Sequence, residues 1–377
     1  MLSLTIEGGD LRDAATWVGR LCPVKHATPI LQGIMLDATE ELTLSAYDFE
    51  TAGTATIPAS VLSPGRALVS GRLLAAIAKT LDPNADVQLN ANENGATLHV
   101  GRNRWEMPTL PIEDYPQLPQ PGEASAKLDA AALRRALDRC LPAADRTNIE
   151  PLSGCLKLES AGQELTIIAT DRWRLAVATL PWDGPEINVV VPTVFAEAMK
   201  AALGAESVAA TLAVGVGPLS LSTDSRRLCG RQGAAQWPVW QRFLPSGGPA
   251  TEAIFVVGEL SLALDRAMVV AGSEAKPRPI RLDVGPNGFV IEAIVDSNSA
   301  NAEAAVSEFR GEPKSVALNA KYMREALDTL EADLATLRIG ARVGSPLDLV
   351  ALDNDGKPEK DYRHIVMPMS PKVLQAK

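Results

Sequence analysis

Aromatic side chains and long apolar runs are both scarce in this chain, and each scarcity limits the folds that the chain can adopt. Phe, Trp and Tyr make up 4% of the 377 residues, so the cores must rest on Leu, Val, Ile and Ala. No apolar run approaches the roughly 18 residues of a membrane-spanning helix, so we expect no such helix. Residues Leu2–Ile6 alternate as in a strand and lack the basic start and apolar stretch of a signal peptide, so we expect a cytoplasmic protein.

Signatures of catalysis and of metal binding are also missing. The four cysteines form no Cys-x-x-Cys pair and are expected to be buried, reduced thiols. The three histidines stand far apart, and there is no phosphate loop, dinucleotide-binding glycine motif or His-Glu-x-x-His segment. We therefore predict no metal, no cofactor and no enzymatic activity. The alternative from another class is an α+β enzyme with an unrecognised site between domains, which turnover of a substrate by the pure protein would reveal.

Basic charge is in deficit as well. The net charge is −10 and the pI is near 5.0, whereas a protein that holds nucleic acid by bulk electrostatics is basic. This charge disfavours a role on DNA but does not exclude one, because a closed ring would hold the duplex by topology. Such a ring needs only a local basic lining.

Three similar segments follow one another at a spacing of about 125 residues. Each has a helix, then a proline with an apolar strand, then a strand that ends at an aspartate. The helices are predicted over residues 10–21, 129–141 and 259–270. The closing aspartates, Asp48, Asp171 and Asp296, lie 123 and 125 residues apart. Because they recur at one place in the repeat, they indicate turn caps rather than a joint acid–base site.

A second helix in each copy carries an apolar ladder at i, i+4 and i+8, which places each trio on one helical face. The ladders are Leu73, Ile77 and Leu81; Phe195, Met199 and Leu203; and Tyr322, Ala326 and Leu330. Ser70, Thr193 and Asn319 precede these helices as predicted N-caps.

The pattern predicts an α+β protein of three topologically similar domains, each with two helices on antiparallel sheet. Turn-rich linkers at Pro116–Glu123 and Leu244–Pro249 set the predicted boundaries at residues 1–122, 123–248 and 249–377. The alternative is three α+β domains without a common role, which the shared order of elements disfavours.

Three motifs resemble those of bacterial DNA sliding clamps, the beta subunits of DNA polymerase III. Ala169–Ala176 is similar to the Ala-Thr-Asp-x-x-Arg-Leu-Ala segment of their middle domain. Trp237–Pro245 resembles the aromatic-Pro-x-aromatic-x-Arg-x-Leu-Pro segment that ends that domain, and Tyr362–Met369 resembles their C-terminal strand. Each motif is weak alone, but their order on a threefold repeat makes the resemblance specific, and it covers essentially the whole chain.

The resemblance implies a DNA clamp fold in which two chains close head to tail into a ring of six domains around duplex DNA. It implies sequence-independent DNA contact and a processivity role without catalysis. The implied partners are a second copy of the chain, the DNA polymerase III alpha subunit, the clamp loader and other proteins that dock short linear peptides between the middle and last domains. No membrane partner is implied.

A peptide pocket needs an apolar floor and a few polar groups that orient the ligand. The motifs offer apolar surface at Leu175, Pro238, Phe243, Ile365, Val366, Met367, Pro368 and Met369. Arg174 and Arg242 offer donors for a peptide backbone or carboxylate. By resemblance, the rim and walls also include Leu152, Thr170, Arg172, Trp173, Asn319, Tyr322, Val343 and Ser345. The alternative is that Met367–Met369 is merely the end of an edge strand, where proline is tolerated.

This pocket departs from the family pattern. Phe243 stands where many clamps have a smaller aliphatic residue, and Arg172 and Trp173 replace smaller groups. The usual Arg-Leu ending is replaced by Ser370–Lys377. The hypothesis is a pocket reshaped for other peptides, or one that excludes a small pocket-binding inhibitor, as a spare, resistance-conferring clamp copy would.

The helix over residues 129–141 is the clearest predicted DNA contact, because arginines lie opposite its apolar face. Contacts from such residues to phosphates give sequence-independent, salt-sensitive binding. The predicted set is Lys25, Arg72, Lys79, Arg134, Arg135, Arg139, Arg146 and Lys200. A solvated helix face is the alternative for any single one. A regulatory scaffold that keeps the fold but no longer loads on DNA is the alternative for the whole.

The segment Arg104–Met107 resembles the strand through which clamps dimerise. Trp105 and Met107 lie two residues apart and so share one face of a strand, where they are predicted to anchor the interface, with Arg104 beside them. The alternative is that Trp105 packs inside its own domain.

Overall fold

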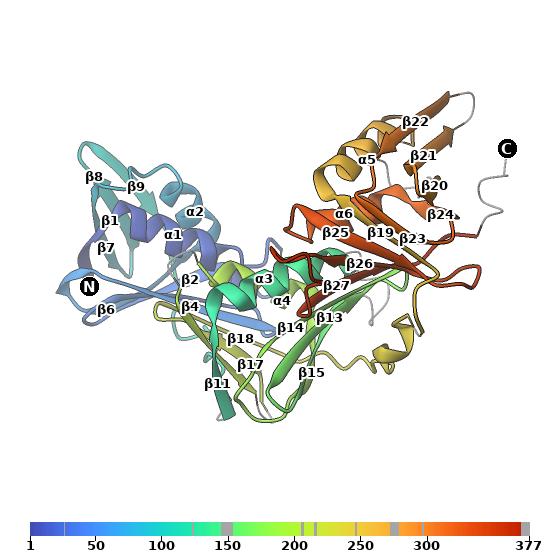
Figure 1. Cartoon of the computed structure of the whole chain (residues 1–377). Helices are drawn as coiled ribbons and strands as arrows, with labels where there is room; N and C mark the ends of the chain where they lie inside the picture. The colour runs from blue at the N-terminus through green and yellow to red at the C-terminus, as the bar shows by residue number, and fades with distance from the viewer. Residues whose placement is uncertain are drawn as a thin grey trace. The chain divides into compact units, whose positions relative to one another are not determined.

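The computed structural model describes residues 1–25, 27–122, 124–144, 154–204, 207–214, 217–245, 247–271, 279–295 and 298–370. The chain divides into two compact units. Unit 1 comprises Met1–Arg134, Trp182–Pro185 and Val194–Gln232, and unit 2 comprises Arg135–Pro181, Glu186–Thr193 and Gly233–Lys377. Both units combine helices with antiparallel sheets, which confirms the predicted α+β class (Figure 1).

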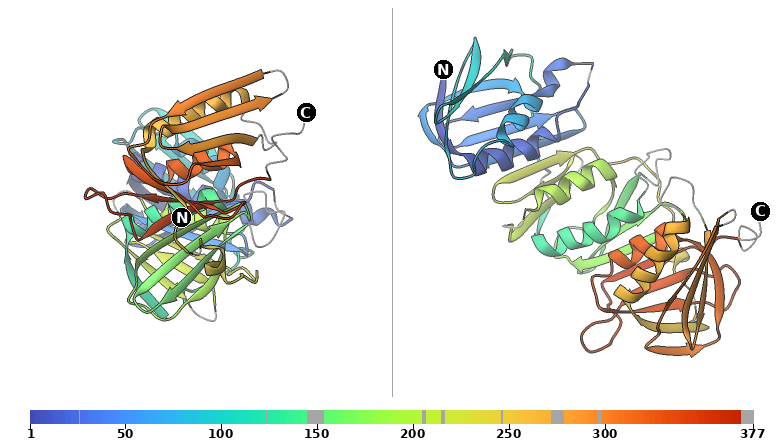
Figure 2. Two further views of the ribbon diagram at one scale, coloured as in Figure 1. Left: turned by 45° about the vertical axis from the view of Figure 1, so that its right-hand side comes forward. Right: turned by 90° about the horizontal axis from the view of Figure 1, so that it is seen from above.

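Unit 1 contains a five-stranded and a nine-stranded sheet. The first has the order β5 (Ser60–Ser63), β1 (Leu2–Glu7), β7 (Asp86–Asn92), β8 (Gly95–Val100), β9 (Asn103–Met107). The second has the order β10 (Thr109–Leu110), β6 (Gly65–Ser70), β2 (Gly33–Ala38), β3 (Leu42–Tyr47), β4 (Thr51–Ile57), β18 (Arg226–Gly230), β17 (Leu219–Ser222), β16 (Ala209–Val214), β11 (Ala124–Asp129). Its helices are α1 (Gly8–Gly19), α2 (Gly71–Ala78) and most of α4 (Thr193–Ala202), and the short 3-10 helix η1 covers Pro29–Gln32. Helices α1 and α2 lie side by side (Figure 2).

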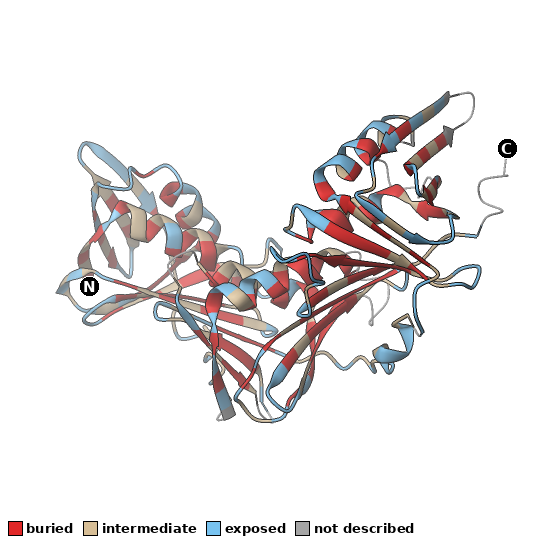
Figure 3. Ribbon diagram, viewed as in Figure 1, coloured by how far each residue is buried: buried red, intermediate tan, exposed pale blue. Residues whose placement is uncertain are grey.

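Unit 2 contains a nine-stranded and a four-stranded sheet. The first has the order β15 (Asn188–Pro192), β12 (Cys155–Ala161), β13 (Glu164–Thr170), β14 (Arg174–Pro181), β27 (Tyr362–Val366), β26 (Leu347–Ala351), β25 (Leu334–Ile339), β19 (Thr251–Val256), β23 (Glu308–Gly311). The second has the order β22 (Asn298–Ala304), β21 (Gly288–Val295), β20 (Pro279–Gly285), β24 (Lys314–Asn319). Its helices are α5 (Val257–Ala271) and α6 (Ala320–Asp328), with 3-10 helices η2 (Leu141–Ala143) and η3 (Trp240–Phe243). Figure 3 shows the buried residues running along the strands of the larger sheet.

The middle third of the chain contributes to both units. Its strands β16–β18 join unit 1 because β18 pairs with β4, and β12–β15 join unit 2 because β14 pairs with β27. Helix α3 (Ala130–Cys140) contains the boundary between the units at Arg134. Each third supplies two helices, α1 and α2, α3 and α4, and α5 and α6, so the predicted threefold similarity is confirmed.

The sequence explains where these helices begin. The side chains of Ser70 and Asn319 accept hydrogen bonds from backbone N–H groups of α2 and α6, which confirms two predicted N-caps, and Thr193 is the first residue of α4. The ladder of α4 is buried throughout. The ladder predicted for α2 is wrong at Leu73, which is 38% exposed, because the buried face of this helix passes through Leu74 instead.

The structure also tests the expectations for the cysteines, for membrane-spanning helices and for metal ligands. Cys140, Cys155 and Cys229 are buried free thiols, and Cys22 is partly exposed. Among the residues that the structure describes, no helix has the length and apolarity to cross a membrane. Within the same ranges, no group of three His, Cys, Asp or Glu side chains is placed to hold a metal ion.

Candidate functional site

The turn between β13 and β14 sets the geometry of the site. Oδ1 of Asp171 accepts hydrogen bonds from the backbone N–H groups of Trp173 and Arg174, each at 3.0 Å. Oγ1 of Thr170 accepts a further one from the N–H of Arg172, which has a φ of 76° in the left-handed region. These bonds confirm the turn-capping role predicted for Asp171. They fix the backbone of Trp173 and Arg174 where the turn leads into β14.

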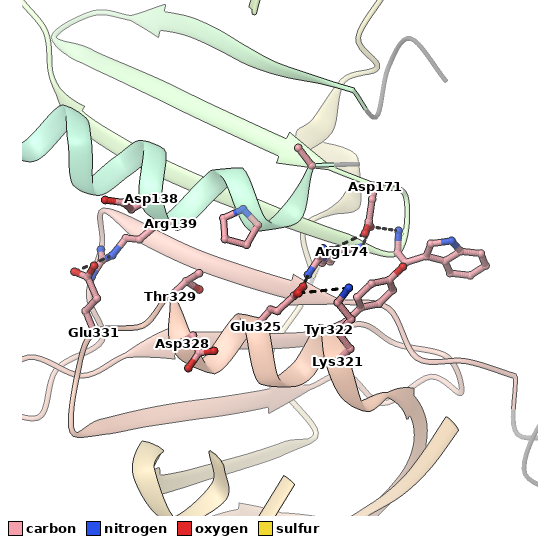
Figure 4. Close-up of a pocket in the computed structure, with 13 residues that line it drawn as sticks. Asp138, Arg139, Asp171, Arg174, Lys321, Tyr322, Glu325, Asp328, Thr329 and Glu331 are labelled. Carbon is pink, nitrogen blue, oxygen red and sulfur yellow. Dashed lines mark hydrogen bonds and ion pairs between the residues drawn. The ribbon is translucent and has the colours of Figure 1, made fainter. Parts of the chain in front are cut away.

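The guanidinium of Arg174 lies in the centre of the site, and its partners come from the same chain (Figure 4). Its Nε donates to Oδ2 of Asp171 at 3.0 Å, its Nη1 donates to Glu325, and its Cζ lies 4.5 Å from the ring centroid of Tyr322. Lys321 lies 3.8 Å from the other oxygen of Glu325. Burial raises the pKa of Asp171, although the Arg174 charge acts in the opposite direction.

The role predicted for Arg174 is therefore corrected. It is 7% exposed, and two of its three nitrogens already donate within the chain, so it does not present a free fork to a peptide carboxylate. A buried cation with two anionic neighbours organises the wall rather than attracting a charged ligand. Arg174 instead positions Tyr322 beneath its guanidinium plane.

A cavity of about 650 Å³ opens beside this cluster within unit 2. Its lining residues come from helices α3 and α6 and the segments that follow them, and from the β13–β14 turn: Asp138, Arg139, Pro142, Ala144, Asp171, Trp173, Arg174, Lys321, Tyr322, Glu325, Asp328, Thr329 and Glu331. Most of the lining is charged, so this cavity suits polar groups and water better than an apolar anchor.

Arg139, in the same cavity wall, is one of the predicted DNA contacts that the structure corrects. It is 3% exposed, its Nη2 lies 3.2 Å from Oε2 of Glu359, and its Nε lies 3.7 Å from Oε2 of Glu331. Its Cζ lies 4.7 Å from the ring centroid of Tyr362. Burial raises the pKa of Glu359, against the lowering effect of Arg139. Because Arg139 is buried and ion-paired with two glutamates, it cannot meet a phosphate.

The apolar floor predicted for the pocket is covered. Leu175 is 5% exposed and Ile365 is 1% exposed, and both belong to a buried cluster with Ile168 and Val177. Val366 is fully buried. The covering residues belong to the linker after β18: Trp237, Trp240 and Leu244. The indole Nε1 of Trp240 donates to Oε1 of Glu159 at 2.6 Å, and Gln241 donates to the same oxygen at 3.4 Å. The prediction that Leu175, Ile365 and Val366 offer surface is therefore wrong.

Other apolar residues of the predicted pocket remain accessible. Trp173 is 56% exposed and Phe243 is 54% exposed, and both belong to the positions at which the chain departs from the family pattern. Pro238, Val343, Arg172 and Arg242 are also exposed, whereas Thr170, Asn319, Tyr322, Ser345, Met367, Pro368 and Met369 are half-buried. Leu152 lies outside the described residues.

The C-terminal segment is not the end of an edge strand. Strand β27 pairs with β14 on one side and β26 on the other, so it lies inside the sheet. Beyond it, the N–H of Met367 donates to the carbonyl of Trp173 at 2.7 Å, and that of Met369 donates to the carbonyl of Ala317 at 2.7 Å. The segment is thereby fixed between the β13–β14 turn and β24.

The remaining predicted DNA contacts divide into two groups. Lys25, Arg72 and Lys79, all in unit 1, are exposed and have no acidic partner among the described residues. Others are engaged: Arg134 donates to the carbonyl of Leu203, Arg135 pairs with Glu331 and Glu359, and Lys200 lies 3.7 Å from Glu197. Arg146 lies outside the described residues.

The predicted dimerisation strand is β9, an edge of the five-stranded sheet. Arg104 is exposed and pairs with Glu106 at 2.6 Å. Trp105 is partly exposed, but Met107 is only 2% exposed and belongs to the core of unit 1. The prediction that Met107 anchors an interface is therefore wrong, because its side chain is already covered.

Sequence reasoning missed several residues of the site. Glu325 stands three positions after Tyr322 on α6, so helical spacing was a usable signal for it. Glu159, Glu331 and Glu359 gave no such signal, because they reach their partners from other elements.

The chain matches models of the three successive domains of the DNA polymerase III beta subunit. The N-terminal domain model matches residues 2–119, the central domain model residues 127–238 and the C-terminal domain model residues 241–370. Together these matches cover nearly the whole chain in the family's own order.

Individual relatives agree. The chain is 27% identical to the beta sliding clamp of Streptomyces coelicolor, over 98% of this chain and 99% of that protein. It is 26% identical to the beta sliding clamp homolog GriR of Streptomyces muensis, over 97% and 98%. A crystal structure of the Pseudomonas aeruginosa sliding clamp bound to griselimycin superposes with a TM-score of 0.88 at 23% identity, covering 98% of this chain and 99% of that one. With its three domains, repeated helix pairs and site geometry, this chain belongs to the DNA polymerase III beta subunit family, the bacterial sliding clamps.

Proposed function

We propose that two copies of this chain close head to tail around duplex DNA and hold replicative and repair polymerases on it. The match to all three beta-subunit domains in order carries this proposal. The protein then acts in the cytoplasm as a non-catalytic accessory subunit. Its domains are proposed to run over residues 1–122, 123–248 and 249–377.

Contact with DNA is proposed to rest on a few cations rather than on net charge. Lys25, Arg72 and Lys79 are exposed and lack acidic partners among the described residues, so their charges are available to phosphates. Because the whole chain carries −10, such contacts are weak, and a ring that slides needs weak contacts.

Partner proteins are proposed to dock linear peptides on unit 2, near the β13–β14 turn. Trp173 and Phe243 supply exposed aromatic surface, and Met367 and Met369 supply adaptable side chains. The proposed occupants are peptides of the DNA polymerase III alpha subunit, the clamp loader and other clamp-binding proteins. The covered floor at Leu175 and Ile365 means that a peptide either displaces the linker or binds on the exposed residues.

Loading onto primed circular DNA tests the main proposal. With a clamp loader and ATP, the protein is expected to become resistant to dilution on circular DNA and to be released when the circle is cut. A polymerase assay then checks for longer products. Failure to load, with a normally folded dimer, would favour the regulatory scaffold instead.

A second function, reduced sensitivity to a pocket-binding inhibitor, is favoured by one observation. Trp237, Trp240 and Leu244 close over the apolar cluster of Leu175 and Ile365. Griselimycin occupies a Pseudomonas aeruginosa clamp in a solved structure, and the GriR clamp homolog is a relative of this chain. We expect griselimycin to bind this chain at least about tenfold more weakly than it binds that clamp, as measured by calorimetry. Equal affinities would remove this second function.

A further inference from the structure

The β3–β4 turn of unit 1 repeats the geometry of the β13–β14 turn of unit 2. Oδ1 of Asp48 accepts hydrogen bonds from the N–H groups of Glu50 at 3.0 Å and Thr51 at 2.6 Å, as Asp171 accepts two in the other turn. Phe49 has a φ of 71°, against 76° for Arg172. The two turns are therefore the same structure with different side chains.

The strand that borders each turn is also equivalent. β18 runs antiparallel beside β4 as β27 runs beside β14. Just past β18, the N–H of Arg231 donates to the carbonyl of Glu50 at 3.0 Å, and just past β27 that of Met367 donates to the carbonyl of Trp173 at 2.7 Å. Arg231 is thus the counterpart of Met367.

The segments that follow β10 and β18 share a feature as well. The first contains Tyr115-Pro116 and the second contains Trp237-Pro238, so each places an aromatic residue before a proline. Tyr115 Oη and Trp237 Nε1 are both buried without a hydrogen-bond partner among the described residues.

A cavity of about 710 Å³ lies at the unit 1 turn. Its lining is Tyr47, Phe49, Glu50, Pro119, Gly217, Pro218, Gly230, Arg231 and Gln232. Phe49 is 48% exposed and meets the ring of Tyr47 edge to face, with centroids 5.5 Å apart. An aromatic residue that is kept in the left-handed region and in contact with solvent costs stability, which points to a use outside the fold.

The charges of the two sites differ in position. Thr51 stands where unit 2 has Arg174, so the unit 1 turn has no guanidinium at that position. A guanidinium lies at its rim instead, where exposed Arg231 pairs with exposed Glu50 at 2.9 Å. The pair is neutral overall, which disfavours nucleic acid as an occupant, because phosphates need uncompensated cations.

We propose that unit 1 carries a second docking site for an extended peptide, with an apolar side chain of the peptide on Phe49 and Tyr47 and a carboxylate of the peptide on Arg231. The peptide carboxylate replaces Glu50 at the guanidinium, and an extended backbone lies along the rim between the turn and the segment after β18. The choice of a peptide rests on the proposed function, because the equivalent turn of unit 2 is the one assigned to peptides.

Photo-crosslinking on the full chain tests this site. The probe is a ten-residue synthetic peptide with two leucines, a benzoylphenylalanine and a flanking aspartate, and mass spectrometry locates the labelled segments. We expect labelling of residues 47–51 or 230–232 in addition to residues 170–175. Phe49→Gly removes the side chain and suits the positive φ, so it leaves the fold intact and is expected to lower labelling of unit 1 about tenfold.

A matched control removes another exposed apolar side chain of unit 1, at Leu62 in β5. Leu62→Ala is expected to leave the labelling unchanged, and Arg231→Ala is expected to lower it about fivefold. Free benzoylphenylalanine is tested in parallel. If it labels residues 47–51 as efficiently as the peptide does, the surface is a nonspecific apolar one and the proposal is overturned.

The remaining outcomes separate this site from the proposed function. Labelling of residues 170–175 alone overturns the second site and leaves the proposed function standing. Labelling of unit 1 alone supports the second site and contradicts the peptide pocket of unit 2. Labelling of neither segment contradicts both.

Discussion

The indole Nε1 of Trp240 donates a hydrogen bond to Oε1 of Glu159 at 2.6 Å, and this contact holds the linker after β18, with Trp237, Trp240 and Leu244, over the apolar cluster of unit 2. Glu159→Ala is expected to release the linker and to raise the affinity of a standard clamp-binding peptide about threefold to tenfold, measured by fluorescence anisotropy.

Glu164→Ala, on an exposed position of the neighbouring strand, is the matched control and is expected to change nothing. An unchanged affinity in Glu159→Ala would mean that peptides bind without displacing the linker.

Arg174 is the buried cation of the site, and its removal takes the ion-pair partner from Asp171 and leaves Glu325 with Lys321 alone. Arg174→Ala is therefore expected to lower the free energy of unfolding by about 3 kcal/mol. Urea denaturation measures this loss, with the exposed Arg342→Ala as control, expected within about 0.5 kcal/mol of the parent. A loss below about 1 kcal/mol in Arg174→Ala would show that the cluster contributes little to stability.

His364 gives a pH dependence with a definite sign. The ring is fully buried, its Nδ1 lies 2.9 Å from the hydroxyl of Tyr362, and burial lowers its pKa from the usual 6.5 to about 3, helped by the Arg174 charge. Above pH 6.5 the ring is neutral in the folded and unfolded states, so its contribution is fully present there. As the pH falls from 6.5 towards 3, only the unfolded chain binds the proton, so stability is lost.

This loss is expected to reach about 1.4 kcal/mol per pH unit, and His364→Gln is expected to remove it. Urea denaturation between pH 7 and pH 4 measures the difference, with His99→Gln in unit 1 as the control. Parallel curves for the parent and His364→Gln would contradict the prediction.

The salt dependence of DNA binding distinguishes the exposed cations from the paired ones. We expect a smaller salt dependence when Lys25, Arg72 and Lys79 are all changed to alanine. The negative slope of the logarithm of the DNA-binding constant against log salt should decrease in magnitude by about 0.9 for each phosphate that the variant no longer neutralises. Arg139→Ala is expected to leave the slope unchanged, since Arg139 is buried against Glu331 and Glu359. Anisotropy of a labelled duplex at several salt concentrations gives both slopes. A changed slope in Arg139→Ala would restore it to the DNA-facing set.

Trp105 is expected to contribute to dimerisation, and Met107 to the folding stability of unit 1. Trp105→Ala is expected to weaken the dimer of 39.9 kDa chains about tenfold, whereas Met107→Ala is expected to destabilise unit 1 by about 3 kcal/mol through a core cavity. Sedimentation measures the first effect and urea denaturation the second. If Trp105→Ala changed stability alone, the alternative that Trp105 packs inside its own domain would hold.

Local patterns in the sequence were sufficient for the repeat, the helix pairs and the capping aspartate of the β13–β14 turn. Helical spacing places Phe195, Met199 and Leu203 on one face without any tertiary information, and an aspartate two and three positions before the N–H groups that it caps acts within one turn. Leu73 shows the limit of such spacing, because Leu73 (at i, i+4) and Leu74 (at i, i+3) both fit one helical face with Ile77, and only packing selects Leu74.

The sequence alone determined that this is a threefold α+β chain with three family motifs in order, since periodicity and motif order are properties of the chain itself. Only the tertiary structure decided that Arg139 and Arg174 are neutralised by Glu359 and Glu325, and that Trp240 covers the floor at Leu175. The physical reason is distance along the chain: the partners of each pair lie far apart in sequence and meet only when the sheets and helices pack. Whether an arginine is free or paired depends on that packing, and no local pattern records it.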